Sequence, residues 1–369
     1  MKRSLFTLLL LFPLVACNNT NTSVYFDVIK VSALGHFTEA QKKYLSNDDE
    51  TNTSPYNGNM SVSYPEPVHI EWESNYSGPY QVNISNNKGI QLNYHCSTNS
   101  FDFYNPLFNE EYKMSIFANN QLSEEITFKE TPSVPGPRNL KVDGVENFRD
   151  IGGWGYFENG VYKTFIKQGM LYRSGRFNED KTDEVKASIT EDGLYEIKNN
   201  FKIKTEIDLR RTSNNEVGVL INKSVLGDDV NYIQLPMAYG GYNILTYIGK
   251  LSGDDYVYDN PAMIKRFFEI LADESNYPIN FHCSIGKDRT GCLAYLIEGL
   301  LSCDCLYRDY MFTNFADAGM CKITDLTDRY EKTIMEYNTF NDNKVFAYLN
   351  EVVGISETTL NTVIRILKA

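Results

Sequence analysis

The sequence predicts two folded domains, a small all-β sandwich followed by an α/β phosphatase-like domain with helices on both faces of its sheet. The length of 369 residues exceeds one typical domain. Short alternating apolar runs separated by Asn-, Ser- and Gly-rich turns fill the first part, whereas the second part alternates strand-like and helical patterns. Three prolines in Thr131 to Pro137 forbid helix and regular strand pairing, so we place a stiff linker at 131–138.

Residues 1–17 are typical of a cleaved export signal. Lys2 and Arg3 precede an apolar run, Leu5 to Val15, that is too short to span a bilayer. The following Ala16-Cys17 completes a segment that resembles a bacterial lipoprotein lipobox, which implies lipidation of Cys17. Residues 18–23 then form a polar tether, and the acyl chains would anchor the protein to the bacterial cell envelope, in the periplasm or at the cell surface. An ordinary secretory signal is the alternative.

Residues 24–130 are expected to form the sandwich. Four segments have strand-like composition or period-two alternation: Val24 to Val31, His69 to Glu73, Tyr80 to Ile84 and Tyr112 to Phe117. The order of Trp72, the Tyr80 segment and Tyr112-x-Met114-x-Ile116 resembles a fibronectin type III or immunoglobulin-like domain. We expect a spacer or binding module without catalytic chemistry.

The overall charge excludes one class of partner. The formal net charge is −13 at pH 7, whereas nucleic-acid binding needs a basic surface. We therefore expect no nucleic-acid partner. A phosphate-binding enzyme remains compatible with this charge, because a local loop can supply the positive field.

The cysteines and histidines predict neither a disulfide framework nor a metal site. The chain contains no CxxC pair, and the region after Arg138 holds one histidine, His282. Cys303 and Cys305 are too close in sequence for an easy mutual bridge. We expect no metal and no other cofactor.

The region 139–369 has the alternating pattern of an α/β layer fold. Three short strands are expected at 203–209, 230–235 and 278–282. Helical spacing follows at 261–273, with Pro261 suited to a first turn, and at 289–301. Further helical patterns occupy 306–315, 323–337 and 358–367.

The segment between Cys283 and Arg289 predicts a phosphate-binding loop. Cys283 ends a buried strand, five residues follow, and Arg289 opens a helix. Such a connection can curl with its N–H groups inward and adds the positive end of the helix, which binds a phosphate and favours a cysteine thiolate. Gly286 permits the tight curve, and Arg289 can donate two hydrogen bonds to two phosphoryl oxygens.

This arrangement predicts covalent catalysis. Cys283 would attack phosphorus, and water would then hydrolyse the phosphocysteine. The Thr290 hydroxyl could hydrogen-bond the sulfur, and Lys287 adds a positive charge at the mouth. Because no second histidine is at hand, a carboxylate must protonate the leaving oxygen, and Asp288 is the nearest in sequence. The expected substrate-binding residues of the loop are Ser284, Ile285, Gly286, Lys287 and Thr290.

The loop and three further motifs resemble the bacterial atypical tyrosine phosphatases. The signature His282-Cys283-x-x-Gly286-Lys287-Asp288-Arg289-Thr290-Gly291 is accompanied, in the same order as in that family, by Asn147 to Gly153, Leu171 to Gly175, and Ile207 to Arg210 with Glu216. The likeness continues through Asp309-Tyr310 and Asn314 to a helix that begins near Ser356, and it covers residues 139–369.

The resemblance implies a metal-independent phosphatase acting on phosphotyrosine, phosphoserine or phosphothreonine proteins, or on phosphoinositides. It maps the nucleophile to Cys283, the phosphate clamp to Arg289 and the general acid to Asp288. It links Lys287 to phosphoinositide recognition, and it places Asp208 and Arg210 beside the loop as pocket-shaping residues. Arg211 departs from the family pattern and is interpreted as a solvated charge. The stretch Met237 to Asp259 has no clear counterpart, in a region that helps to cover the pocket in the family.

Two other classes stay open at this point. A sulfurtransferase or an arsenate reductase also uses a cysteine at a phosphate-like loop, although the spacing to Arg289 and the lack of a resolving cysteine beside the loop argue against both. An inactive, phosphate-recognising binding module on the cell envelope is the second alternative. The presence of a nucleophile, an acid and an arginine favours turnover over binding alone.

Overall fold

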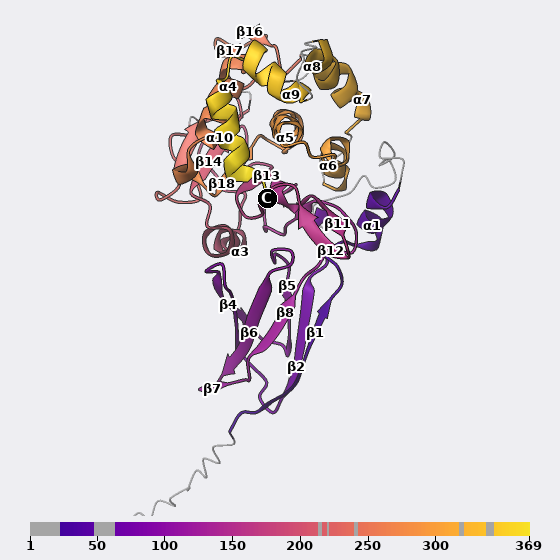
Figure 1. Ribbon diagram of the computed structural model, residues 1–369. Coiled ribbons are helices and arrows are strands. Elements are labelled where there is room, and N and C mark those ends of the chain that lie inside the picture. Colours follow the sequence, from indigo (N-terminus) through magenta and orange to yellow (C-terminus); the bar gives the residue numbers. More distant parts are fainter. Residues whose placement is uncertain are drawn as a thin grey trace, which may run out of the picture.

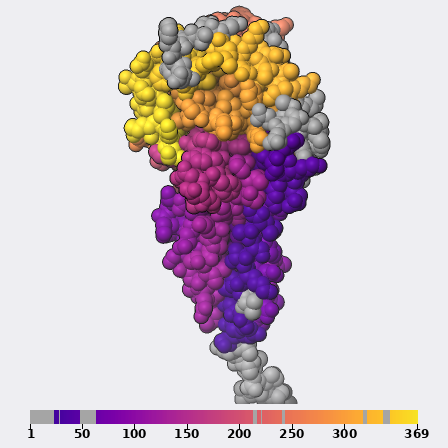
Figure 2. Space-filling model, turned by 45° about the vertical axis from the view of Figure 1, so that its right-hand side comes forward, coloured from indigo at the N-terminus to yellow at the C-terminus, as the bar shows by residue number. Residues whose placement is uncertain are grey.

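The structure is a computed structural model that describes residues 23–47, 63–212, 216–219, 221–239, 243–316, 321–336 and 343–369. Two bodies lie end to end, a narrow β body and a wider body rich in helices (Figures 1 and 2). The predicted signal with Cys17, and residues 18–22 of the predicted tether, lie outside the described residues. Among the helices in these ranges, none combines the length and apolar character that a bilayer crossing needs.

The β body consists of two antiparallel sheets. The first has the order β1-β2-β5, with β1 at Phe26–Ala33, β2 at Val68–Ser74 and β5 at Ser100–Phe103. The second has the order β4-β3-β6-β7 with β8 on β6, and its strands are β3 Tyr80–Asn86, β4 Gln91–Cys96, β6 Glu111–Ala118, β7 Gln121–Leu122 and β8 Ile126–Lys129. The predicted strands near His69, Tyr80 and Tyr112 are confirmed.

One core joins the two sheets. Alternate residues of β2, β3 and β6 are buried, as period-two strands with one inward face require. Trp72 of the first sheet meets Tyr80 of the second edge to face, with ring centroids 5.1 Å apart. This packing is consistent with the predicted sandwich, while the likeness to a fibronectin or immunoglobulin domain stays a prediction.

A helix that the sequence analysis does not foresee interrupts the β body. Helix α1 (Glu39–Leu45) follows β1 and begins with a capping box formed by Thr38 and Gln41. Its Tyr44 ring lies against Phe315 of the other body, with centroids 5.9 Å apart. Figure 2 shows this indigo segment rising along the molecule to reach the helical body. Helix α1 therefore packs on the second body rather than on the β body.

The predicted linker is packed rather than free. Pro132, Gly136 and Pro137 are buried, and a Cβ at Gly136 would lie 2.6 Å from Phe37 and Leu45 side-chain atoms. Arg138 is buried as well; it pairs with Asp150 at 2.6 Å. The two bodies are therefore joined by a close seam.

The helical body is built on a six-stranded sheet of order β15-β14-β18-β13-β10-β9. Its four consecutive strands from β15 to β13 are parallel and its β10 pairings are antiparallel. The bounds are β9 Arg138–Asn139, β10 Arg149–Asp150, β13 Leu171–Ser174, β14 Thr205–Asp208, β15 Asn231–Gln234 and β18 Ile279–His282. The three strands expected from the sequence are confirmed, and the central strands are buried because both faces are covered.

Both faces of the sheet carry a core. Leu171 belongs to the large cluster that includes α4 and α5, whereas the next residue of β13, Tyr172, belongs to a second cluster with Ile197 and Phe201. Successive strand residues point to opposite faces, so helices cover both sides as predicted. Two β-hairpins complete the body, β11 (Gly155–Glu158) with β12 (Val161–Thr164) and β16 (Ile248–Lys250) with β17 (Val257–Asp259).

The main helices begin where the sequence predicts. Helix α4 (Asn260–Leu271) is capped by Asp259, and α10 (Glu357–Leu367) by Ser356. Helix α5 spans Asp288–Leu300, and the described residues also include α3 Glu191–Tyr195, α6 Leu306–Phe312, α7 Ile323–Leu326, α8 Lys332–Glu336 and α9 Lys344–Ala347.

Cys303 and Cys305 form a disulfide in the turn between α5 and α6. The expectation that they do not bridge easily is wrong, because this turn brings their Cα atoms to 5.3 Å, within the usual range for a disulfide.

Candidate active site

The predicted loop connects the end of β18 to the start of α5. Cys283 follows the last strand residue, and Lys287 precedes the first helical residue, Asp288. Gly286 has a φ of +70°, and a Cβ there would lie 2.6 Å from the Ser174 carbonyl oxygen. Only glycine fits this bend without strain. The loop therefore has the strand–loop–helix geometry expected from the sequence.

Side chains and backbone from neighbouring segments hold the loop carbonyls on the outside. The Ser284 carbonyl accepts from the Arg176 N–H at 3.1 Å and from Arg176 Nη1 at 3.2 Å. The Ile285 and Gly286 carbonyls each accept from Asn147 Nδ2 at 3.1 Å. Asn147 adopts a φ of +56°, a conformation that asparagine tolerates better than most residues.

These anchors determine where the loop amides point. In a planar trans peptide the C=O and N–H groups point in opposite directions. Three consecutive carbonyls, those of Ser284 to Gly286, are bound outside the loop, so the N–H groups of the residues that follow each of them turn inward. The loop therefore presents a concave row of donors, the arrangement that binds phosphate oxygens.

A buried network of ion pairs supports the residues that bind the loop carbonyls. Asp309 of α6 pairs with Arg149 at 2.9 Å and with Arg173, and it accepts from Trp154 Nε1 at 3.1 Å. Arg173 Nη2 in turn donates to the Gly286 carbonyl at 2.8 Å, and Arg149 donates to Asn147. Burial opposes ionisation of Asp309, but the two arginines keep its pKa below the ordinary value of an aspartate.

Arg289 is held by one edge of its guanidinium and leaves another edge unused. Glu216 accepts from Nη1 at 2.8 Å and from Nη2, and the Leu209 carbonyl accepts from Nη1 at 3.3 Å. Nε is buried and finds no hydrogen-bond partner among the described residues. Nε and the second hydrogen of Nη2 lie on one side of the planar group, so two parallel donors remain for an oxyanion.

The Glu216 carboxylate is ionised and balances the positive charge of Arg289. Burial opposes its charge, but Arg289 and the backbone N–H of Arg211 lower the pKa of Glu216 to about 2. The same pair raises the pKa of Arg289 against the effect of burial. Cys283 and Arg289 are 2% and 1% exposed, so the sulfur and the guanidinium share a buried environment in which their charges are weakly screened.

Ser284 faces the outside of the loop rather than its concave side. Its hydroxyl lies 2.5 Å from Asp180 Oδ2 and 2.8 Å from Glu216 Oε1. Its side chain therefore braces the loop against Glu216, and its backbone remains for the substrate role predicted from the sequence.

Asp208 and Arg210 form a second buried pair at the end of β14. Arg210 Nη2 meets Asp208 at 2.6 Å, and Arg210 Nη1 donates to Asp180 at 2.8 Å. Burial acts against Asp208, yet Arg210 holds the pKa of Asp208 below its usual range. The pair reaches the loop through Asp180, which meets Ser284. The pocket-shaping role that the resemblance implies stays a prediction.

The other predicted residues lie at the helix start. Asp288 and Lys287 are half-buried, and Asp288 occupies the first turn of α5, where the helix dipole favours a carboxylate. The Thr290 hydroxyl is buried without a partner among the described residues. Ile285 is half-buried and contributes its backbone groups. Arg211 is not merely a solvated charge, because its side chain is 15% exposed and its Nε lies 3.4 Å from Glu216 Oε2.

His282 has the structural place expected for it. Its Nε2 lies 2.9 Å from Glu206 Oε1, and these two residues and Asp208 are close enough to share a cation. Each carboxylate already has a protein partner, Ser224 on Glu206 and Arg210 on Asp208. The three residues therefore fit a closed hydrogen-bond network better than a metal site.

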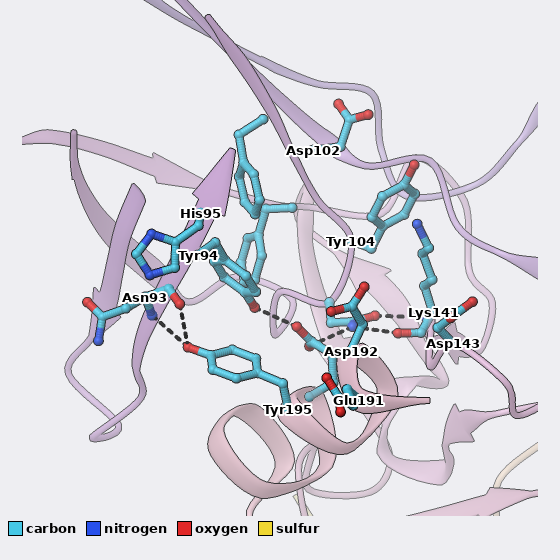
Figure 3. A pocket seen from close by; sticks show the side chains of 14 residues that line it. Asn93, Tyr94, His95, Asp102, Tyr104, Lys141, Asp143, Glu191, Asp192 and Tyr195 are labelled. Atoms are coloured by element: carbon cyan, nitrogen blue, oxygen red, sulfur yellow. Dashed lines mark hydrogen bonds between the residues drawn. The ribbon is translucent and has the colours of Figure 1, made fainter. Parts of the chain in front are cut away.

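A separate hollow of about 680 Å³ lies where β4 and β5 meet α3 (Figure 3). Tyr195 Oη donates to the Asn93 carbonyl at 2.8 Å and Tyr94 Oη to Glu196 at 2.6 Å, so hydrogen bonds join the two bodies there. Five carboxylates are among its lining residues, Asp102, Asp143, Glu191, Asp192 and Glu196. Their negative charge disfavours a phosphate ester in this hollow.

Several supporting residues were not assigned these roles from the sequence. Asn147, Arg149 and Glu216 stand in the motifs quoted above but gave no indication of their partners. Asp180 lies outside every motif. Only Asn147 carried a sequence signal for its role, because asparagine tolerates the left-handed backbone conformation better than most residues.

Residues 140–369 match a sequence profile described as "Tyrosine phosphatase family". No curated protein matches the chain. Among solved structures, the core catalytic domain of the PP-IP phosphatase SIW14 from S. cerevisiae is similar at 18% identity and a TM-score of 0.28, over 46% of this chain and 88% of that one. TpbA of P. aeruginosa is similar at 15% identity and a TM-score of 0.27, over 48% and 88%. TM-scores this low support no inference about this chain.

Proposed function

Because this chain belongs to the tyrosine phosphatase family, we propose that it hydrolyses phosphate monoesters through a phosphocysteine formed on Cys283. One observation carries the proposal. The buried edge of Arg289, with an unpartnered Nε, lies at the end of a loop whose amides turn inward. Such unused donors in a buried site are costly unless a ligand accepts from them.

In the first step the Cys283 thiolate attacks phosphorus as the bond from phosphorus to the ester oxygen breaks. The leaving alcohol or phenol takes a proton from Asp288. The loop amides and the free edge of Arg289 stabilise the three equatorial oxygens while charge moves across the phosphoryl group. Poor leaving groups such as alkyl alcohols depend on this proton most.

In the second step water attacks the phosphocysteine. Asp288, now a carboxylate, accepts a proton from that water, and the sulfur departs as a thiolate. The Thr290 hydroxyl, which has no partner among the described residues, donates a hydrogen bond to the sulfur and eases this departure. The products are inorganic phosphate and the starting enzyme, so no cofactor is consumed.

We propose phosphotyrosine proteins as the main substrates, with phosphoserine or phosphothreonine proteins and phosphoinositides as further ones. Lys287 is the N-cap residue of α5, directly after the loop, and its charge suits a second phosphate. This range of substrates is supported by the family resemblance and by the positive charge of Lys287.

We also propose that Cys17 carries a lipid anchor at the cell envelope. The support comes from the sequence, because Cys17 lies outside the described residues. The first described strand, β1, begins at the end of the β body that faces away from the helical body (Figure 1). An anchor there makes the β body a spacer that holds the catalytic site away from the membrane.

The test uses the full chain in detergent with p-nitrophenyl phosphate and EDTA. We expect hydrolysis that survives the chelator, and we expect Cys283→Ser to abolish it while orthophosphate still binds by calorimetry. Hydrolysis by the serine variant at the parent rate would refute the mechanism. A parent protein that binds orthophosphate but never turns over would make it a binding module.

A further inference from the structure

Tyr239 covers one face of the catalytic arginine. The Arg289 guanidinium carbon lies 4.1 Å from the centre of the Tyr239 ring, within the range of a cation–π contact. The Arg211 guanidinium lies 5.3 Å from the same ring. Tyr239 is half-buried, whereas Arg289 is buried. The ring therefore lies on the more accessible side of the guanidinium.

Hydrogen bonds fix both backbone groups of Ala238, the residue that precedes Tyr239. The Ala238 N–H donates to Asn260 Oδ1 at 2.9 Å, and Asn260 Nδ2 donates to the Ala238 carbonyl at 3.0 Å. Asn260 is fully buried at the start of α4. The Met237 N–H also donates to the Leu209 carbonyl, which accepts from Arg289. These hydrogen bonds therefore fix the backbone that leads into Tyr239 relative to the Arg289 guanidinium.

Glu216 and Tyr239 restrain different motions of the guanidinium. The two-point pair with Glu216 fixes rotation within the plane of the group, but it resists tilting out of that plane only weakly. A ring on the face opposes this tilt without competing for the in-plane N–H donors. The free edge, Nε and one hydrogen of Nη2, then points in one direction only.

We propose that Tyr239 is a positioning residue that aims the free edge of Arg289 at the phosphate seat. The proposal rests on the proposed function, and it concerns a stretch for which the sequence offers no family counterpart. Because Tyr239 acts through the arginine, it affects every phosphate-bearing ligand alike, including orthophosphate. It does not select the leaving group.

The experiment compares three variants of the full chain in detergent. Tyr239→Ala removes the ring, Tyr239→Phe keeps it, and Tyr256→Ala removes an exposed tyrosine of the same stretch as a matched control. The readouts are kcat/KM for p-nitrophenyl phosphate and the Kd for orthophosphate in a Cys283→Ser background. The second readout needs binding only, so it separates this proposal from the catalytic one.

We expect Tyr239→Ala to weaken both readouts about tenfold, the size of an arginine–ring contact shielded from water. Tyr239→Phe and Tyr256→Ala should stay within about twofold of the parent. Unchanged orthophosphate binding by the alanine variant would overturn the positioning role even if hydrolysis fell. Equal losses for phenylalanine and alanine would also overturn it, because the hydroxyl rather than the ring would then be the active part.

Discussion

Two buried arginines lie near the end of β14, and they differ in how their donors are used. All three nitrogens of the Arg210 guanidinium donate hydrogen bonds to protein acceptors. Nε and Nη2 donate to Asp208, and the other hydrogen bonds go to Asp180 and Asn178. Arg289 pairs with Glu216 and the Leu209 carbonyl but keeps Nε without a partner among the described residues. Both guanidiniums are deeply buried.

This difference points to different roles for Arg210 and Arg289. A buried donor without a partner loses its hydrogen bonds to water and makes no hydrogen bond to the protein in return. A missing partner alone does not distinguish the two roles, because Arg173, which supports the loop through the Gly286 carbonyl, also has a buried Nε without a partner among the described residues. Arg289 differs in that its free edge belongs to the residue that closes the loop of inward-turned amides. The unused edge of Arg289 is therefore best explained by a ligand that supplies two acceptors in one plane, such as a phosphoryl group.

The largest effect should come from replacing the arginine with the free edge. Arg289→Lys keeps the charge but loses the planar pair of donors, so we expect kcat/KM for p-nitrophenyl phosphate to fall about 10³-fold. Steady-state kinetics measures this loss, and circular dichroism checks that the variant is folded. Activity within tenfold of the parent would mean that the free edge is not the phosphate clamp.

Removing the charge of the other arginine should act on stability instead. Arg210→Met leaves Asp208 buried without its main partner, which costs about 3 kcal/mol of unfolding free energy. Chemical denaturation measures this cost. We expect the folded fraction to keep kcat/KM within about tenfold of the parent. A loss as large as that of Arg289→Lys, at unchanged stability, would show that Arg210 binds substrate directly.

The sequence predicts the local parts of this site and not the long-range ones. The loop, its glycine and the start of α5 depend on residues that are neighbours in the chain, so spacing and residue type reveal them. Asp309 meets Arg149 across 160 positions and Glu216 meets Arg289 across 73. No local pattern encodes such pairs, because a buried charge can be balanced by any carboxylate that the fold brings near.

Helix α1 shows the same limit at the level of the fold. Its seven residues carry a capping box, but Tyr44 becomes core only because Phe312 and Phe315 lie opposite. The predicted linker is similar, since the prolines are visible in the sequence and the burial of Gly136 against Phe37 is not. Both features belong to the seam between the bodies, which composition cannot reveal.

Glu130 is a buried carboxylate with no cationic partner among the described residues, unlike Asp208 and Glu216, and its ionisation should make the stability depend on pH. Burial raises the pKa of Glu130 to about 7, although the backbone N–H groups of Gly35 and His36 favour its ionised form. Its folded pKa lies above the unfolded value of 4.5, so its contribution to stability is fully present below pH 4.5 and is lost as the pH rises through 7. This loss amounts to roughly 3 kcal/mol.

The measurement is the difference in unfolding free energy between Glu130→Gln and the parent. We expect the variant to gain on the parent steadily from pH 4.5 to 7. Burial lowers the pKa of His36 to about 3, and this residue gives the parent an opposite slope below its unfolded value. Only the difference between the two proteins therefore isolates Glu130, and a difference that is constant with pH would contradict the prediction.

The smallest effect should come from Arg211, whose side chain is 15% exposed and whose Nε lies 3.4 Å from Glu216. Its backbone N–H makes the shorter contact with that carboxylate, and Arg211→Ala keeps this N–H. We therefore expect a stability loss below about 1 kcal/mol and a fall in kcat/KM of less than about threefold. A fall approaching that of Arg289→Lys would mean that Glu216 needs both guanidiniums to hold the free edge in place, and the phosphate clamp would then be a pair of arginines rather than one.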